Sequence, residues 1–403
     1  MVPGWLREPR WAALATSFLM VVLVQGISNS FSVFLLPLSD ELGGLRSAAA
    51  AAFSVHNLAV GLMATVVDRL MERFGERPML ALGALVLGAG VGLAGTARTP
   101  VELLFWFGLV AGVGAGFLGS VAQTVMLNRW FPTARGAVNG IALSGMGLGI
   151  FIFAPLSGYL IARVGWRMAF ATLGAGTALL LLPTAALTPS RPPELARAAA
   201  PGSASARDEQ LGAILGTARF WCFAAAFFFT PISNFMVTTH QVAHLVESGF
   251  DASRAAAAFG LVGLLSAVGR VGFGTLSDRW GRVPAALLSY AATAGGTLAL
   301  LLLAPGAPGW LLWAYILPFG LTLGARGPIV AALTADVYRG RSYGAVLGLI
   351  TFGNRLGSAI GPWLGGVIHD LTGSYRAALA VSVTALCLAA TAFWAAGRGE
   401  RRP

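Results

Sequence analysis

Lysine is absent from this chain of 403 residues, and all 27 of its basic residues are arginine. Charged residues make up only 11% of the sequence, less than half of the roughly 25% found in an ordinary soluble domain. The chain has two cysteines, Cys222 and Cys387, and both fall inside apolar runs. These shortages exclude a disordered protein and a disulfide scaffold, and they argue against a soluble enzyme.

Sequence patterns that carry chemistry are also missing from the loops. They contain no metal-ligand cluster, no phosphate-binding loop and no nucleophile elbow. The sequence therefore predicts a protein that is not an enzyme and has no cofactor or metal. The net charge of +11 lies in short loops between apolar runs, which favours retention of these loops on one side of a membrane over nucleic-acid binding.

Apolar residues are what the chain has in excess, at 56% of the sequence. They form twelve runs, each long enough to cross a bilayer as a helix, and helices are the form that runs of this length take in lipid. We expect an all-α integral membrane protein with twelve transmembrane helices. The runs lie near 11–38, 47–66, 79–97, 101–127, 136–162, 167–187, 219–245, 254–277, 283–304, 309–335, 342–368 and 375–396.

The chain also repeats itself. A shift of 208 residues superimposes six glycines in two runs, for example Gly165 on Gly373. Parallel repeats of this kind are the architecture of one large class of transporters, which hold the substrate between the two halves near the midplane. We therefore divide the chain into an N-terminal six-helix half (1–187), a central loop (188–218) and a C-terminal six-helix half (219–403).

The distribution of arginines predicts the orientation. Eighteen arginines lie in the two termini and in the loops that twelve spans place on the same side of the membrane as the termini. Six lie in the loops on the opposite side, and three lie within runs. By the positive-inside rule, both termini and the central loop are cytoplasmic. We expect a multi-pass protein of the plasma (inner) membrane, with lipid around it, that functions as a monomer.

Two loops carry a shared motif. Gly274, Asp278, Arg279, Gly281 and Arg282, after the eighth run, match the spacing G-x-x-x-D-R-x-G-R. The loop after the second run carries Glu72 and Arg73 in the corresponding place, with Asp68 where the first glycine belongs. This pattern resembles the loop signature of the major facilitator superfamily. The resemblance implies that Glu72, Arg73, Asp278, Arg279 and Arg282 are gating residues, whose ion pairs break and reform as the halves rock.

Three arginines lie within apolar runs: Arg270, Arg326 and Arg355. An arginine at the centre of a bilayer costs about 2.5–3.5 kcal/mol to insert, and no carboxylate occurs in the middle of a run. Uncompensated positive charge in an interior cavity calls for an anion. The repeat places all three arginines opposite uncharged residues, Gly147 in the case of Arg355, which argues against a generic packing role.

Guanidinium binds a carboxylate through two parallel hydrogen bonds, so Arg270 and Arg355 are the main substrate-binding candidates. Arg326 lies beside a Gly-Pro break, where it serves either as a ligand or as a donor to freed carbonyls. Asn354 points about 100° away from Arg355 around the helix and is a weaker candidate.

These features narrow the resemblance. The chain resembles the monocarboxylate transporter and oxalate/formate antiporter group in three places: Arg270 in the eighth run, the loop from Trp130 to Gly136, and the stretch from Gly353 to Pro362. The resemblance implies that Arg270 binds the substrate carboxylate and that Arg355 is the antiporters' second cation. Ser266 replaces the aspartate that proton-coupled animal members have four residues before the arginine, and Asn29 stands nearest to their lysine in the first span.

Histidines are the remaining candidates for proton coupling. His240 lies in the seventh run, one turn before His244, and His56 lies in the second run. A histidine can carry a proton near neutral pH. The alternative is that each is a hydrogen-bonded polar group within the bundle.

We therefore expect a secondary transporter that moves a small organic anion, a mono- or dicarboxylate, by alternating access. It would work by anion exchange or by proton symport, so a counter-anion or protons are the expected second partner. The alternative with the same fold is an exporter of a drug-like or siderophore-like compound. A membrane sensor is the alternative of another class, and it predicts a long tail or an additional soluble domain.

Overall fold

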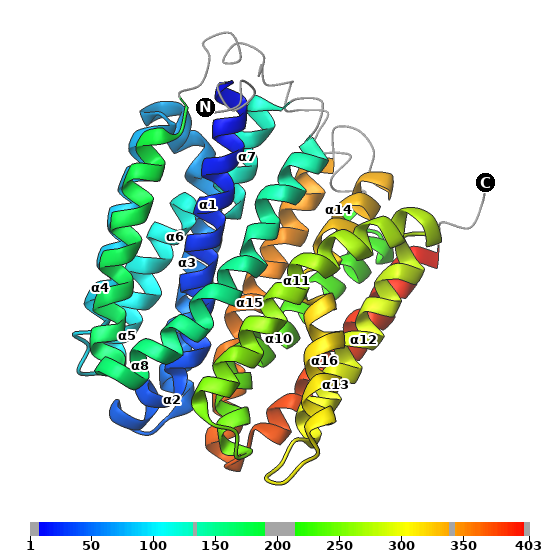
Figure 1. Cartoon of the computed structure of the whole chain (residues 1–403). Helices are drawn as coiled ribbons and strands as arrows, with labels where there is room; N and C mark the ends of the chain where they lie inside the picture. The colour runs from blue at the N-terminus through cyan, green and yellow to red at the C-terminus, as the bar shows by residue number, and fades with distance from the viewer. Residues whose placement is uncertain (1–7, 132–134, 190–213, 338–342, 399–403) are drawn as a thin grey trace.

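The chain folds into a bundle of long helices in the computed structural model (Figure 1). The structure describes residues 8–131, 135–189, 214–337 and 343–398, and no strand occurs among them. The all-α expectation is confirmed. The predicted central loop lies mostly outside the described residues.

Most of the helices are long and apolar. The bounds are α1 (Pro9–Asn29), α2 (Phe31–Glu41), α3 (Arg46–Phe74), α4 (Glu76–Ala94), α5 (Pro100–Leu103), a π-helical segment (Leu104–Ala111), α6 (Gly112–Leu118), α7 (Ser120–Trp130), α8 (Arg135–Leu187), α10 (Ala218–Glu247), α11 (Ala252–Trp280), α12 (Arg282–Leu302), α13 (Gly309–Leu323), α14 (Arg326–Val337), α15 (Tyr343–Thr372) and α16 (Tyr375–Gly397).

The described residues include nine continuous helical stretches long and apolar enough to cross a membrane. One of them, α8, has 53 residues, about 80 Å of helix, which is far more than the roughly 30 Å of a bilayer core. It is divided at Gly165, whose φ of 76° is accessible to glycine, and its two parts run in opposite directions (Figure 1). Helices α13 to α15 lie where the tenth and eleventh runs were predicted.

The helices pack as two groups, α1–α8 and α10–α16, on the left and right of Figure 1. One apolar cluster draws almost entirely on the first group, and another draws only on the second. The two most extensive interfaces between the groups are seams that we name by their helices. The α3–α15 seam joins the second and eleventh runs, and the α8–α11 seam joins the fifth and eighth.

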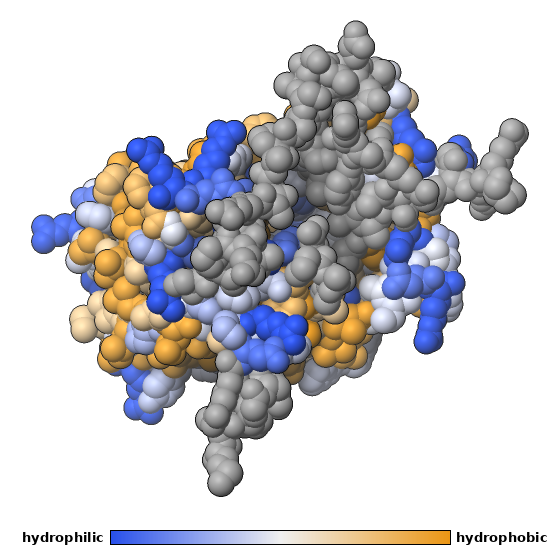
Figure 2. Space-filling view, turned by 90° about the horizontal axis from the view of Figure 1, so that it is seen from above, coloured by the Kyte–Doolittle hydropathy of each residue, from blue (hydrophilic) through white to orange (hydrophobic). Residues whose placement is uncertain are grey.

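The bundle has two ends, which we name by the position of the chain termini. Helix α1 begins and α16 ends at one end, upper in Figure 1, which we call the terminal end; the opposite end is the distal end. Figure 2 views the molecule from above and shows hydrophilic side chains projecting from the rim of that face, with hydrophobic residues between them. This distribution is typical of a protein whose apolar sides face lipid.

Candidate transport site and its gates

The three arginines of the apolar runs lie at similar depths. Arg270 is four residues past the middle of α11, or about 6 Å along the helix, toward the terminal end. Arg355 lies close to the middle of α15, and Arg326 begins α14 just after the interruption of the tenth run. These positions agree with the placement predicted from the sequence, Arg270 toward the inner half of its run and Arg355 and Arg326 near the middle of theirs.

Arg270 lies in the α8–α11 seam. Its Nη1 donates to the main-chain oxygen of Leu143 on α8 (3.1 Å), and its Nη2 lies 3.5 Å from the sulfur of Met146. Its Nε is buried without a hydrogen-bond partner among the described residues. Gly324 leaves the space for this side chain, because a Cβ there would lie 2.7 Å from Nη2 and 3.0 Å from Nε. Arg270 therefore reaches from one helix group to the other while keeping unused donor capacity.

Arg355 lies in the other seam. Its aliphatic carbons pack against Gly61 of α3, where a Cβ would lie 3.0 Å from the arginine Cβ. Its Nε, like that of Arg270, is buried with no hydrogen-bond partner in the described part of the chain. Each seam thus contains in its middle one partly exposed arginine, contributed by the C-terminal group.

Arg270 and Arg355 are not brought into contact. Helix α11 packs on α8 and α13, whereas α15 packs on α3 and α10. No hydrogen bond or ring contact joins the two arginines among the described residues. Two side chains at similar depth in separate seams can hold the two ends of one anion only if that anion spans the space between them.

Arg326 has a different environment. Its Nη1 donates to the Ser289 oxygen (3.2 Å) and to Thr293 Oγ1 (2.7 Å), and its Nη2 donates to Asn234 Oδ1 (3.0 Å). Its guanidinium also lies 4.8 Å from the centre of the Tyr290 ring. These partners belong to α10 and α12 of the same group. The geometry therefore favours the structural alternative for Arg326.

The two asparagine candidates bond to main-chain oxygens. Asn354 Nδ2 donates to the Phe227 oxygen of α10 (3.4 Å) and so points away from the α3–α15 seam. Asn29 Nδ2 donates to the Gln25 oxygen one turn earlier (2.7 Å), at the end of α1. Neither amide is placed beside Arg270 or Arg355 by a described contact.

The candidate histidines are buried and hydrogen-bonded. His56 Nδ1 lies 3.2 Å from the Phe107 oxygen, and His240 Nε2 lies 2.8 Å from the Pro362 oxygen. Because a carbonyl oxygen only accepts, the histidine nitrogen in each bond carries the hydrogen. Each histidine therefore links two helices, α3 to the π-helical segment and α10 to α15, which matches the alternative of a hydrogen-bonded polar group.

At the terminal end, the motif residues form ion pairs within each helix group. Arg129 of α7 contacts Glu72 (3.4 Å) and Glu76 (3.2 Å), and it also pairs with Asp68, which replaces the motif glycine. Arg73 instead stacks over the ring of Phe74 (5.2 Å). In this loop, the arginine that holds the carboxylates comes from a neighbouring helix.

The second motif copy pairs over a shorter range. Asp278 pairs with Arg282 four residues later, and Arg282 also donates to Ser277 Oγ (2.9 Å). No ion pair of Arg279 occurs among the described residues. The ion pairs of Arg129 and of Asp278 at the terminal end thus each join residues of one group.

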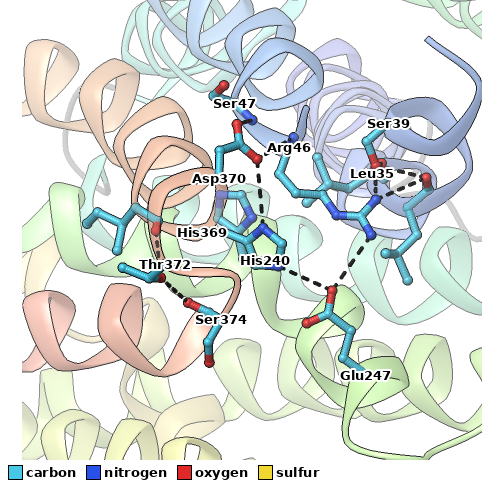
Figure 3. Close-up of polar contacts among 12 residues, drawn as sticks. Leu35, Ser39, Arg46, Ser47, His240, Glu247, His369, Asp370, Thr372 and Ser374 are labelled. Carbon is cyan, nitrogen blue, oxygen red and sulfur yellow. Dashed lines mark hydrogen bonds and ion pairs between the residues drawn. The ribbon is translucent and has the colours of Figure 1, made fainter. Parts of the chain in front are cut away.

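The distal end contains a polar cluster that the sequence analysis did not single out (Figure 3). Asp370 of α15 accepts the main-chain N–H groups of Arg46 and Ser47, each at 2.9 Å. The Arg46 guanidinium lies 3.7 Å from Glu247, which also lies 3.4 Å from His369. The contacts of Asp370 and Glu247 with Arg46 and Ser47 cross between the two groups, whereas the Glu247–His369 contact lies within the C-terminal group. In the sequence, these charged residues are recognisable only as loop and helix-end residues. The pairing of Asp370 with Arg46 could not be predicted, because residues more than 300 positions apart share no local pattern.

The helical bundle has apolar sides, and its two helix groups have arginines in the seams between them. Polar contacts join the groups at one end. These features are typical of a multi-pass membrane transport protein. Residues 17–340 match the Major Facilitator Superfamily, and the chain belongs to this superfamily. It resembles the monocarboxylate transporter group within it. It is a secondary transporter of a small-molecule substrate, and its relatives are transporters and not enzymes.

Three similar proteins illustrate the relationship. The chain is 29% identical over 384 residues to monocarboxylate transporter 13 of Bos taurus, covering 94% of this chain and 86% of the relative. It is 29% identical over 393 residues to monocarboxylate transporter 11 of Homo sapiens, covering 94% and 80%. A crystal structure of the nucleoside transporter NupG has a TM-score of 0.78 at 13% identity, covering 96% of this chain and all of that chain, and it shows the shared fold.

Proposed function

We propose that this transporter moves small organic anions, mono- or dicarboxylates, and that it works by anion exchange. The observation that carries the proposal is Arg270, a cation in the α8–α11 seam with a buried Nε that has no partner among the described residues. A charge at this depth is costly without compensation, and a carboxylate compensates it through two parallel hydrogen bonds. The similarity to monocarboxylate transporters supports the same substrate class.

Arg270 also connects substrate binding to the movement of the two helix groups. Its Nη1 bonds across the seam to the Leu143 oxygen. A bound carboxylate competes for this donor, so binding weakens one of the contacts that join α11 to α8. Rocking of the two groups then exposes the substrate to either side.

Arg355 is the proposed second cation. It contributes from the α3–α15 seam, so it binds the far carboxylate of a dicarboxylate or a polar oxygen of a smaller anion. Arg326, with its described partners on α10 and α12, is proposed as a structural residue of the C-terminal group. His56 and His240 remain the candidates for proton coupling if transport proves to be symport.

We also propose that the terminal end faces the cytoplasm in the plasma (inner) membrane, because eighteen arginines lie on that side. The division into halves at the central loop, 188–218, is part of the same proposal. With the distal end outside, the ion pairs that bridge the groups at that end close the outer side of the protein.

The test is uptake of a panel of labelled mono- and dicarboxylates into proteoliposomes. We expect saturable carboxylate uptake that is stimulated by unlabelled carboxylate inside the vesicles. A neutral sugar and a cationic drug serve as comparison substrates. Transport of the cationic drug in place of every carboxylate would contradict the proposal.

Coupling is tested in the same vesicles. No described acidic residue lies in the middle of a span, so we expect exchange to proceed without a proton gradient. Reorientation without substrate would leave the charges of Arg270 and Arg355 uncompensated, which favours reorientation with an anion bound. A strict requirement for an inward proton gradient that is lost in His240→Ala would instead show histidine-linked symport.

A further inference from the structure

Helix α3 begins without an N-cap of its own. Its first residue is Arg46, and the preceding residue, Leu45, has no side-chain oxygen to accept the first main-chain N–H groups. Leu45 nonetheless has the extended backbone of an N-cap, with φ −90° and ψ 121°. The beginning of a helix carries unsatisfied N–H donors and partial positive charge, so α3 needs an acceptor from elsewhere.

Asp370 supplies that acceptor from the other helix group. One carboxylate oxygen accepts from the Arg46 N–H, and the other accepts from the Ser47 N–H. Gly366, one turn before Asp370, allows the approach, because a Cβ there would lie 2.5 Å from Ser47 Cα. The N-cap of α3 is therefore provided in trans, at the distal end of the α3–α15 seam (Figure 3).

The corresponding helix of the C-terminal group has its own cap. Asp251 precedes α11 and accepts from the main-chain N–H groups of Ser253 (2.9 Å) and Arg254 (3.3 Å). These bonds, that of Ser253 first, hold the pKa of the Asp251 carboxyl below its ordinary value. Leu45 and Asp251 are separated by 206 residues, as are the motif residues Glu72 and Asp278. The two helices thus begin at equivalent positions, and only α11 carries a capping side chain there.

Other charged groups surround Asp370 and have to be distinguished from the cap. His369 Nδ1 lies 3.7 Å from an Asp370 oxygen. The Arg46 side chain points toward Asp40 (2.8 Å) and Glu247 (3.7 Å), and it also contacts Ser39. An effect of Asp370 could therefore arise from its charge or from its role as a cap, and a double-mutant cycle separates these contributions.

We propose that Asp370 is a trans N-cap that latches the distal end shut, so that opening this end uncaps α3. In the closed state the two first N–H groups of α3 have a carboxylate acceptor, and in the open state they face solvent. The latch stabilises the closed state relative to the open state regardless of which substrate is carried. A transporter that alternates between two states is sensitive to such a difference.

The test measures the distance across the distal end in the purified full-length chain. Nitroxide labels are attached at Thr96→Cys and Arg254→Cys, which are both exposed and lie in different helix groups. The distance between the labels, measured by pulsed electron–electron double resonance, reports the opening of the distal end. The native cysteines are first replaced, as Cys222→Ser and Cys387→Ala, because both are at least partly accessible. The ratio of long-distance to short-distance populations gives the open-to-closed ratio.

We expect Asp370→Ala to raise the open-to-closed ratio by roughly two- to thirtyfold, the factor that loss of an N-cap corresponds to. Leu45→Asp, which gives α3 the capping residue type that Asp251 provides for α11, should raise it in the same way, because α3 then keeps a cap in the open state. Leu45 is 54% exposed, so the substitution removes little packing. In the Leu45→Asp background, Asp370→Ala should have no further effect.

The controls separate capping from charge. Leu45→Asn provides a neutral cap of similar strength and should act like Leu45→Asp. Asp251→Ala removes a cap within one helix group and should leave the distance distribution unchanged. The proposal is overturned if Asp370→Ala retains its full effect in the Leu45→Asp background, if either Leu45 substitution leaves the ratio unchanged, or if Asp370→Ala alone does.

Discussion

Helices α3 and α11 are counterparts in the two groups, yet they connect to the opposite group in different ways. Helix α11 carries its own N-cap, Asp251, and reaches across its seam with Arg270. Helix α3 has no cap of its own and no arginine in the middle of its seam: its cap comes from Asp370, and the seam arginine, Arg355, comes from α15. In the middle of both seams, the arginine that lies between the groups belongs to the C-terminal group.

This difference shows how a repeated fold acquires an asymmetric function. The packing surfaces repeat: Gly158 of α8 faces Ala256 near the beginning of α11, and Gly366 of α15 faces Ser47 at the beginning of α3. The polar groups do not repeat, since the residue 208 positions before Asp370 is Ala162. Small residues allow the helices of both seams to pack closely. The charged residues instead lie where we propose that they bind an anion, as Arg270 and Arg355 do, or hold the distal end closed, as Asp370 does.

The largest effect is expected in the α8–α11 seam. Arg270→Ala and Arg270→Lys should both abolish carboxylate transport, because Ala removes the charge and Lys lacks the planar fork. Loss of one partner of a buried charge pair costs about 2–5 kcal/mol, which corresponds to at least thirtyfold in affinity. Uptake and substrate affinity are measured in proteoliposomes.

Arg254→Lys on the same helix is the matched control, since Arg254 is exposed near the N-terminus of α11. It should transport at the normal rate. Near-normal uptake by both Arg270 variants would remove Arg270 from the site.

A smaller effect is expected when Arg270 is displaced and not removed. A Cβ at position 324 would collide with its guanidinium, so Gly324→Ala should weaken substrate affinity by about tenfold, or about 1.4 kcal/mol. Gly327→Ala is the control, because nothing lies within 4 Å of the Cβ it introduces. Equal behaviour of the two variants in a binding titration would show that the orientation of Arg270 in the seam is not important.

The α3–α15 seam is tested by the charge of the substrate. Arg355→Gly introduces the residue found at the equivalent position, Gly147, and we expect it to insert normally. Dicarboxylate affinity should fall by about tenfold or more, while monocarboxylate affinity changes little. If both classes of substrate lose affinity equally, Arg355 does not bind the second carboxylate; if neither does, Arg355 is structural.

The arrangement of the helices was largely predictable from the sequence. Apolar runs of about 20 residues leave few alternatives to membrane-spanning helices, because the main chain must satisfy its hydrogen bonds internally in lipid. The repeated glycines indicated two related groups, and Gly165 and Gly373 indeed occupy equivalent breaks, with φ of 76° and 68°. The rarity of charge within these runs also made Arg270, Arg326 and Arg355 conspicuous.

The tertiary structure decided what each of these residues touches. Arg326 and Arg355 look alike in the sequence, but Arg326 has hydrogen-bond partners on two neighbouring helices and Arg355 lies against a glycine in a seam. Asp370 and Leu45 are ordinary helix-end residues until α15 is placed against the first turn of α3. The sequence by itself determined where the helices lie along the chain and how apolar they are, since both depend on local hydrophobicity. Contacts between residues hundreds of positions apart depend on how the helices pack, and this packing turned helix-end charges into a latch.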